Sequence, residues 1–220
     1  MSGIKHLSLS EEVYSRLMRK ILDGNFTEGS RLREEILCRE LGVSRTPVRE
    51  ALIRLAREGV LEQIPRRGCV LRKLPPEEIE ELLRYRCLLE CLVLREYFDL
   101  IDREKCRALD AKLDKAVKKG EKELRGVLLS ADEELHELIT LSCHNSFLAK
   151  ELKRVQLLCR PYRVLRCAEA ENTSSILKER QHIIKAVLSG DAGKAETALS
   201  THFEKSRRYY LRDKGTKITS

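Results

Sequence analysis

The stretch that decides the fold is LGVSRTPVREAL, residues 41–52. Gly42 supplies the permissive backbone of a tight turn, and Ser44 or Thr46 can cap the helix that follows. Apolar residues then recur with helical spacing at Val48, Ala51, Leu52 and Leu55. The stretch therefore predicts a turn followed by a helix with one buried face.

The polar residues of this helix lie off its apolar face and close to its N-terminus. Arg45, Thr46 and Arg49 hold the positions from which a recognition helix contacts bases and phosphates. A helix over about 34–40 precedes the turn. Two short apolar strands, 61–64 and 69–72, follow and flank a Pro/Gly turn, which is typical of a hairpin. Together these segments predict a winged helix-turn-helix.

The tip of the predicted hairpin carries Arg66 and Arg67. Two guanidinium groups in this place suit the phosphate backbone or an adjacent minor groove. The alternative is an ordinary three-helix unit over 11–73 whose basic surface is merely solvated. The agreement of turn, cap, apolar spacing and basic hairpin favours DNA binding.

Charge is concentrated in the same part of the chain. The 220 residues carry a net charge of +8, which favours polyanionic partners. Residues 1–74 contain 15 Lys and Arg against 10 Asp and Glu, whereas residues 75–220 contain 28 against 25. The excess positive charge per residue is therefore several-fold higher where the helix-turn-helix is predicted.

Composition also limits the location of the protein and the use of its cysteines. No stretch is apolar enough to cross a bilayer, and the N-terminus has no apolar signal core, so we expect a cytoplasmic protein with no membrane partner. None of the eight cysteines forms a CxxC pair, which favours reduced and mostly buried thiols. Cys87 and Cys91 share a helix face, and a soft metal there is the alternative.

The N-terminal segments resemble a known family. EGSRL at 28–32, GVSRTPVREAL at 42–52 and Arg67-Gly68 are similar to the GntR family of bacterial transcriptional regulators. The resemblance implies operator contacts from Arg45 and Arg49, with Gly68 at the wing tip. Glu35 departs from relatives that place an arginine near this position, and Arg33 beside it is a candidate contact.

Beyond Leu74-Pro75-Pro76 the pattern becomes helical throughout. Two prolines stiffen a linker at 74–76 and oppose helix until the next turn. Helical patterns cover about 77–100, 102–119, 121–143, 146–168, 173–189 and 192–212. The predicted organisation is a flexible tail at 1–10, the DNA-binding domain at 11–73, an all-α antiparallel bundle at 77–213 and a tail at 214–220.

Within the bundle, a few residues have the spacing of metal ligands. Asp132 and His136 lie one helical turn apart on the same face. His182 and His202 lie on the last two predicted helices, 20 residues apart, and can face the core at similar depth if those helices are antiparallel. One carboxylate with three imidazoles suits zinc, nickel or manganese. His144 is an alternative ligand, or else ends its helix beside Asn145.

The same region resembles the FCD effector domain of the FadR subfamily. The resemblance rests on DEELH at 132–136, Asn145, Gln181-His182 and Gly190-Asp191 leading to His202. It implies a helical bundle in which many members hold a metal through one Asp and three His. Carried over residue by residue, these ligands are Asp132, His136, His182 and His202.

Two arginines are candidates for binding an anionic effector. RCLLE at 86–90 resembles the family's Arg-x-x-Leu-Glu stretch, and Arg86 can hold a carboxylate bidentately. The alternative for Arg86 is a structural ion pair with Glu90, one turn away. Arg163, on a later helix, is a second candidate for reaching the cavity, and a solvated surface position is its alternative.

The sequence thus predicts a ligand-responsive transcriptional regulator, expected to be a repressor. It would bind an inverted-repeat operator in double-stranded DNA as a homodimer, with a small carboxylate as effector. The alternatives are a metal-sensing regulator without a metabolite, and a metal-dependent enzyme. No nucleophile–base pair or phosphate loop supports the enzyme, so no catalytic residue is predicted.

Overall fold

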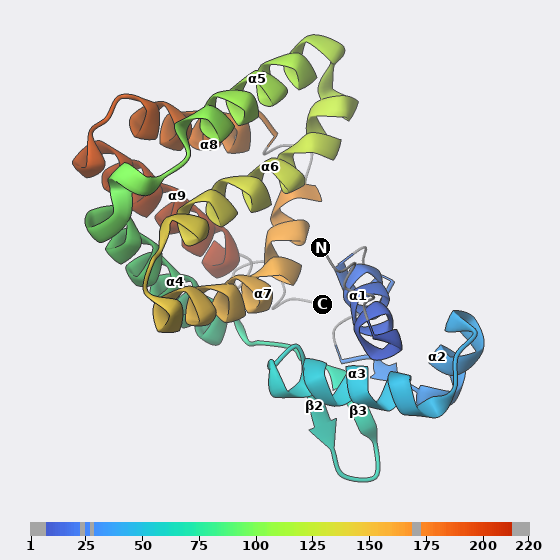
Figure 1. The fold of residues 1–220 in the computed structure, drawn as a ribbon. Helices are drawn as coiled ribbons and strands as arrows, with labels where there is room; N and C mark the ends of the chain where they lie inside the picture. The colour runs from blue at the N-terminus through green and yellow to red at the C-terminus, as the bar shows by residue number, and fades with distance from the viewer. Residues whose placement is uncertain (1–7, 23–24, 27–28, 169–172, 213–220) are drawn as a thin grey trace, which may run out of the picture. The chain divides into compact units, whose positions relative to one another are not determined.

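The computed structural model describes residues 8–22, 25–26, 29–168 and 173–212, although a few side chains near the end of the seventh helix are outside this description. The chain divides into two compact units between Leu74 and Pro75. Figure 1 shows the elements of each unit. Predicted tail residues 1–7 and 214–220 lie outside the described residues, but Leu9 and Ser10, assigned to the tail, begin the first helix.

The first unit contains helices α1 (Leu9–Leu22), α2 (Glu34–Leu41) and α3 (Arg45–Arg57). Its strands are β1 (Arg31–Leu32), β2 (Leu61–Ile64) and β3 (Gly68–Leu71). They form an antiparallel sheet in the order β1-β3-β2. Strand β1 is an addition to the predicted hairpin, because two residues are too few to show alternation. This is the architecture of a winged helix-turn-helix.

The turn between α2 and α3 has the predicted backbone. Gly42 adopts φ +67°, and the Val43 amide donates to the Cys38 carbonyl, a left-handed end to α2. Ser44 begins α3 in extended conformation, but its side chain makes no capping hydrogen bond. Thr46 lies inside the first turn of α3 and is exposed. Backbone geometry, rather than a hydroxyl cap, thus sets the start of α3.

Helix α3 is held from its apolar side. Its buried residues are the four that the helical spacing predicted, Val48, Ala51, Leu52 and Leu55, together with Pro47. Helix α1 packs against α3. The Tyr14 hydroxyl donates to Glu58 at 2.6 Å, and the Arg54 guanidinium lies 3.9 Å from the centre of the Tyr14 ring. These contacts leave the opposite side of α3 in solvent.

The second unit is all-α over its described residues. Its helices are α4 (Pro76–Tyr97), α5 (Arg103–Lys119), α6 (Glu121–Ser142), α7 (Ser146–Ala168), α8 (Thr173–Leu188) and α9 (Ala192–Arg212), with a 3-10 turn, η1 (Phe98–Leu100), after α4. All six helices were predicted within a few residues of these bounds.

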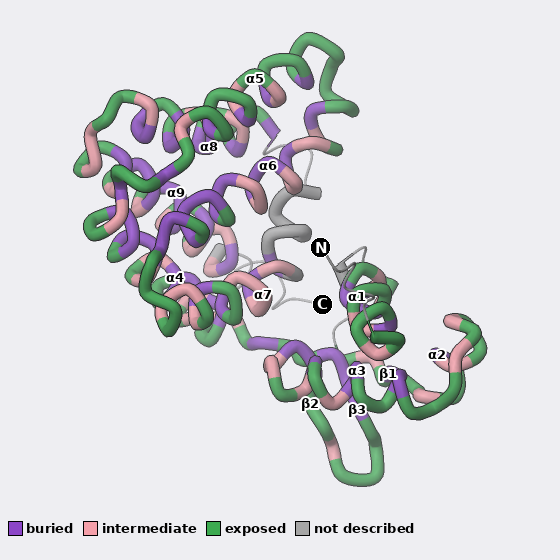
Figure 2. The backbone as a smooth tube through the Cα atoms, in the orientation of Figure 1, coloured by how far each residue is buried: buried purple, intermediate pink, exposed green. Residues whose placement is uncertain are grey.

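Helix α6 occupies a central position in this bundle, since it packs against α4, α5, α7 and α8. Helix α9 packs against both α4 and α8. Figure 2 shows buried and exposed positions alternating along these helices. A polar side chain on the buried face of α6 therefore meets partners from several helices at once. No described helix has both the length and the hydrophobicity to cross a membrane.

Candidate functional site

The exposed side of α3 carries the predicted DNA-contacting residues. The side chains of Arg45 and Arg49 are 74% and 71% exposed. Ser44 and Thr46, at the same end of the helix, are also exposed. Because the opposite face is buried in the core of the unit, these groups can only meet a partner from solvent.

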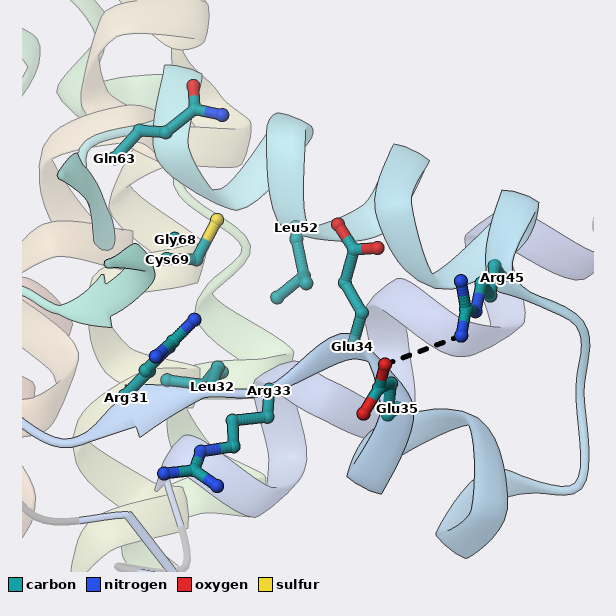
Figure 3. Close-up of a pocket in the computed structure, with 10 residues that line it drawn as sticks. All are labelled: Arg31, Leu32, Arg33, Glu34, Glu35, Arg45, Leu52, Gln63, Gly68 and Cys69. Carbon is teal, nitrogen blue, oxygen red and sulfur yellow. Dashed lines mark hydrogen bonds and ion pairs between the residues drawn. The ribbon is translucent and has the colours of Figure 1, made fainter. Parts of the chain in front are cut away.

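Two glutamates of α2 lie beside these arginines. Arg45 donates to Glu35 at 3.4 Å, drawn as a dashed line in Figure 3, and Arg49 lies 3.6 Å from Glu34. Such exposed ion pairs are worth at most about 1 kcal/mol. A phosphate group can therefore replace either glutamate at little cost.

The wing presents the other predicted arginines. Arg66 and Arg67 are exposed at the turn between β2 and β3, and the Arg67 amide donates to the Ile64 carbonyl at 3.0 Å. Arg66 has φ +64°, a conformation that the second central residue of a type II turn requires and that glycine adopts more easily. Gly68 has φ +78°, which explains glycine at that position.

Strand β1 adds an arginine that the sequence did not single out. A hollow of about 450 Å³ is lined by Arg31 of β1 together with Arg33, Arg45 and Gly68 (Figure 3). The guanidinium of Arg31 lies beside the wing glycine, 3.8 Å from the place of a Cβ on Gly68. The pairing of β1 with β3 brings Arg31 to the wing, and no local pattern indicates that pairing.

The second unit contains a buried polar cluster that includes three of the four predicted metal ligands. Ligand atoms of Asp132, His136 and His202 all lie within 4.8 Å of one another, and all three residues are buried. Asp132 and His136 come from adjacent turns of α6, and His202 comes from α9. The Nε2 atoms of the two histidines lie 3.7 Å and 3.9 Å from Asp132 Oδ1.

Each histidine is oriented by a buried carboxylate on its other nitrogen. Nδ1 of His136 lies 2.5 Å from Glu90 Oε2, and Nδ1 of His202 lies 3.2 Å from Glu179 Oε2. A carboxylate on one ring nitrogen fixes the ring so that the other nitrogen faces a metal. Nε2 of His136 has no hydrogen-bond partner among the described residues, although it is fully buried.

Burial and neighbouring charges set the protonation of this cluster. Burial lowers the pKa of His202 to about 4, and burial with the nearby Arg86 lowers the pKa of His136. Burial opposes ionisation of Glu90, but Arg86 and His136 outweigh it and lower its pKa to about 2. At neutral pH the histidines are therefore neutral, the form that can bind a metal.

Arg86 forms the ion pair that was one of its two predicted roles. Its Nε donates to Glu90 at 2.7 Å, and its side chain is 1% exposed. The guanidinium also lies 5.3 Å from the Phe203 ring centre. One of its nitrogens, Nη2, has no hydrogen-bond partner among the described residues. The ion pair therefore leaves part of the guanidinium available.

His182 is the predicted ligand that the structure does not bring to the cluster. It is exposed on α8, where it lines a surface hollow with Lys185 and Asp191. The buried face of α8 instead passes through Glu179 and Arg180. Residues two positions apart in a helix point about 200° apart around its axis. His182 therefore points away from the cluster when Arg180 points toward it. The expectation of a third imidazole in this group is corrected accordingly.

Two other candidates also lie outside the cluster. His144 is exposed after α6, beside Tyr97, while Asn145 caps α7 by accepting from the amides of Phe147 and Leu148. The side chain of Arg163, on α7, is outside the described residues. The sulfurs of Cys87 and Cys91 are 3.9 Å apart on α4, and the described cysteines form no disulfide.

Sequence reasoning missed three polar residues that support the cluster, of which Glu179 and Arg180 are buried and Gln156 is half-buried. Glu179 and Arg180 lie on the apolar stripe of α8, between Ile176 and Ile183, and that position was the signal. Gln156 of α7 donates to Thr140 Oγ1 at 2.7 Å and to the His136 carbonyl at 3.1 Å. It fixes the turn of α6 that carries His136.

A winged helix-turn-helix joined to a separate helical domain is the organisation of a DNA-binding transcriptional regulator. Residues 9–71 match the family described as "Bacterial regulatory proteins, gntR family", and residues 81–205 match the FCD domain. The chain belongs to the GntR family and carries an FCD effector domain. It is therefore a DNA-binding transcriptional regulator rather than an enzyme.

Individual relatives agree with this assignment. The chain is 28% identical over 195 residues to the HTH-type transcriptional regulator YdhC of Bacillus subtilis, covering 87% of this chain and 86% of that protein. It is 32% identical over 196 residues to an HTH-type regulator from an unstable DNA locus of Streptomyces ambofaciens, covering 87% and 80%. A putative GntR regulator from Rhodococcus sp. RHA1 has the same fold, with a TM-score of 0.79, 24% identity and coverage of 94% and 99%.

Proposed function

We propose that this regulator binds its operator under the control of a small organic acid, which binds at a metal ion in the helical domain. The observation that carries the proposal is the arrangement of the two buried histidines. Both turn Nε2 toward Asp132, and both have Nδ1 held by a buried carboxylate. Carboxylates placed in this way orient histidines for metal binding.

The donor set fits a divalent transition metal. A carboxylate oxygen and two neutral imidazoles suit zinc or nickel, and also manganese. The unpartnered Nε2 of His136 supports this fit, because a buried polar atom without a partner is costly. A bound metal would supply an electrophilic centre for an effector oxygen. Three protein ligands leave coordination positions for it.

Arg86 would bind the carboxylate of the effector. Its guanidinium is buried, directed by Glu90, and keeps Nη2 without a partner in the described part of the chain. A rigid guanidinium binds a planar carboxylate more specifically than a lysine does. Arg163 remains a second predicted contact.

Binding to DNA would use a homodimer on an inverted repeat. Arg45, Arg49 and Thr46 would contact the major groove, with Ser44 at the helix start, and Arg66, Arg67 and Gly68 would approach the backbone or minor groove. Arg33, exposed at the start of α2, is a further phosphate contact. Such a protein acts on the chromosome and therefore in the cytoplasm. We expect repression that the effector relieves, because the effector would bind one arrangement more tightly.

Thermal unfolding of the full chain tests the effector proposal. The wild type is measured with a panel of small carboxylates, before and after chelation, beside His202→Ala. We expect one class of carboxylate to raise Tm, and chelation or His202→Ala to remove the effect. A metal-induced rise with no carboxylate response would instead favour the alternative, a metal-sensing regulator. No response to metal or carboxylate would contradict both.

A further inference from the structure

Arg180 meets the Asp132–His136–His202 cluster from α8, the helix that carries the predicted third imidazole, His182. The Arg180 side chain is 2% exposed, and Nη2 lies 2.6 Å from Asp132 Oδ1. Nη1 donates to the Ile176 carbonyl at 3.0 Å, which ties the guanidinium to its own helix. The oxygen that Arg180 contacts is the same oxygen toward which both histidine Nε2 atoms are directed.

We propose that Arg180 is the resident counter-ion of the Asp132–His136–His202 cluster and that it competes with a metal ion for Asp132. The inference rests on the proposed metal site and adds the residue that sets its affinity. Without a metal, the buried carboxylate is neutralised by the guanidinium. A metal ion binds the cluster only by displacing Arg180 from Asp132 Oδ1.

The physical reason is charge in a site with little solvent. A guanidinium keeps its charge in proteins, so Arg180 cannot avoid the conflict by losing a proton, as a lysine can. Two cations a few ångströms apart repel strongly where water is excluded. The single carboxylate of Asp132 cannot fully neutralise both the Arg180 guanidinium and a metal ion. The cluster should therefore bind metal more weakly than the same three ligands would without Arg180.

The arrangement also gives the cluster a device for regulation. A site closed by an internal cation responds to metal over a higher concentration range than an open site does. Once Asp132 is taken by the metal, Arg180 has donors directed into the cluster. An incoming carboxylate is the group that these donors can bind next. Arg180 therefore links the metal to the anion.

Calorimetric titration of the metal-stripped full chain with Zn²⁺ alone tests the competition. The variants are Arg180→Gln, which removes the charge, and Arg180→His, which adds a neutral donor. Lys178→Gln is the matched control, because it removes one positive charge from an exposed position on the same helix. We expect Arg180→Gln to bind Zn²⁺ at least tenfold more tightly than the wild type, Arg180→His more tightly still, and Lys178→Gln within twofold of the wild type.

If Arg180→Gln and Arg180→His bind Zn²⁺ no more tightly than the wild type does, the inference about Arg180 is overturned. The proposed metal site would still stand in that case if the wild type itself binds Zn²⁺ tightly. No Zn²⁺ binding by any of these proteins would overturn both. If Arg180→Gln does not fold, side-chain NMR of ¹⁵N-arginine in the wild type gives the answer. The Arg180 signal, assigned by its loss in Arg180→His, should move when Zn²⁺ saturates the cluster. A stationary signal would overturn the competition.

Discussion

Four arginines divide evenly between the two units, and their surroundings differ. Arg45 and Arg49 lie on the exposed side of α3, each beside one exposed or half-exposed glutamate. Arg86 and Arg180 are almost completely buried, and each is bound to a buried carboxylate. Solvent weakens an exposed pair, so its arginine can exchange partners, whereas a buried pair cannot be broken cheaply. The first pair of arginines can bind an external polyanion, and the second pair organises an internal site.

Arg86→Ala should have the largest effect. It leaves Glu90 charged and buried with less compensation, which typically costs about 3–5 kcal/mol of unfolding free energy. Urea unfolding followed by circular dichroism measures the loss. Arg95→Ala is the matched control, because Arg95 pairs with Glu196 on the exposed side of the same helix and should cost less than about 1 kcal/mol. Equal losses in the two variants would contradict the contrast between buried and exposed pairs.

Arg49→Ala should abolish the specific footprint while the fold stays intact. Loss of a base contact costs about 1–3 kcal/mol of binding free energy and relaxes sequence specificity. Loss of a phosphate contact instead weakens binding to all DNA sequences to a similar extent. Footprinting on DNA selected from a random pool by the wild type measures the effect. Arg57→Ala, at the other end of α3, is the control and should bind nearly normally. An unchanged footprint in Arg49→Ala would show that α3 is not the recognition helix.

Substitutions at the wing should separate backbone strain from DNA binding. Arg66→Gly relieves a left-handed conformation that costs an ordinary residue about 1–2 kcal/mol, so stability should stay equal or rise slightly. Arg67→Gly relieves no such strain and should lower stability by several tenths of a kcal/mol, roughly the entropy cost of glycine. Both variants should bind DNA more weakly, measured by gel shift beside thermal unfolding. Unaltered DNA binding in both would exclude the wing from the interface.

Glu35→Gln should have the smallest effect on stability. The Arg45–Glu35 pair is exposed, so the change should stay within about 0.5 kcal/mol. DNA affinity should rise a few-fold, because one negative charge near the phosphates is removed, and the gain should shrink at high salt. Glu12→Gln, on the exposed side of α1, should leave affinity unchanged. A fall in affinity on Glu35→Gln would mean that Glu35 orients Arg45 for binding.

Local patterns were sufficient for most of the fold. The apolar spacing of α3, the left-handed Gly42 and the Pro/Gly turn of the wing depend on residues within one or two turns of each other. The six helices of the second unit carry equally local signals at their ends, such as Asp102 and Asn145 as caps. Strand β1 was missed because its two residues become a strand only by pairing with β3.

The candidate site was predictable in part. Asp132 and His136 follow from helical spacing on one helix, and His202 was expected from the resemblance to the FCD domain. His182 did not follow, because its spacing from His202 says nothing about which way it points. Arg180 and Glu179 lie on the apolar stripe of α8, but a charged residue on such a stripe does not by itself indicate which partner it meets.

The class of the protein is readable from the chain alone, because the second helix of the helix-turn-helix, the wing hairpin and each single helix of the second unit depend on contacts between near neighbours in the chain. Only the tertiary structure decided the composition of the buried cluster. Glu90, Asp132, Arg180 and His202 come from four different helices, α4, α6, α8 and α9, which meet at this cluster. A charged residue becomes an interior residue only when an opposite charge from another helix compensates for the loss of water, and no single helix carries that information.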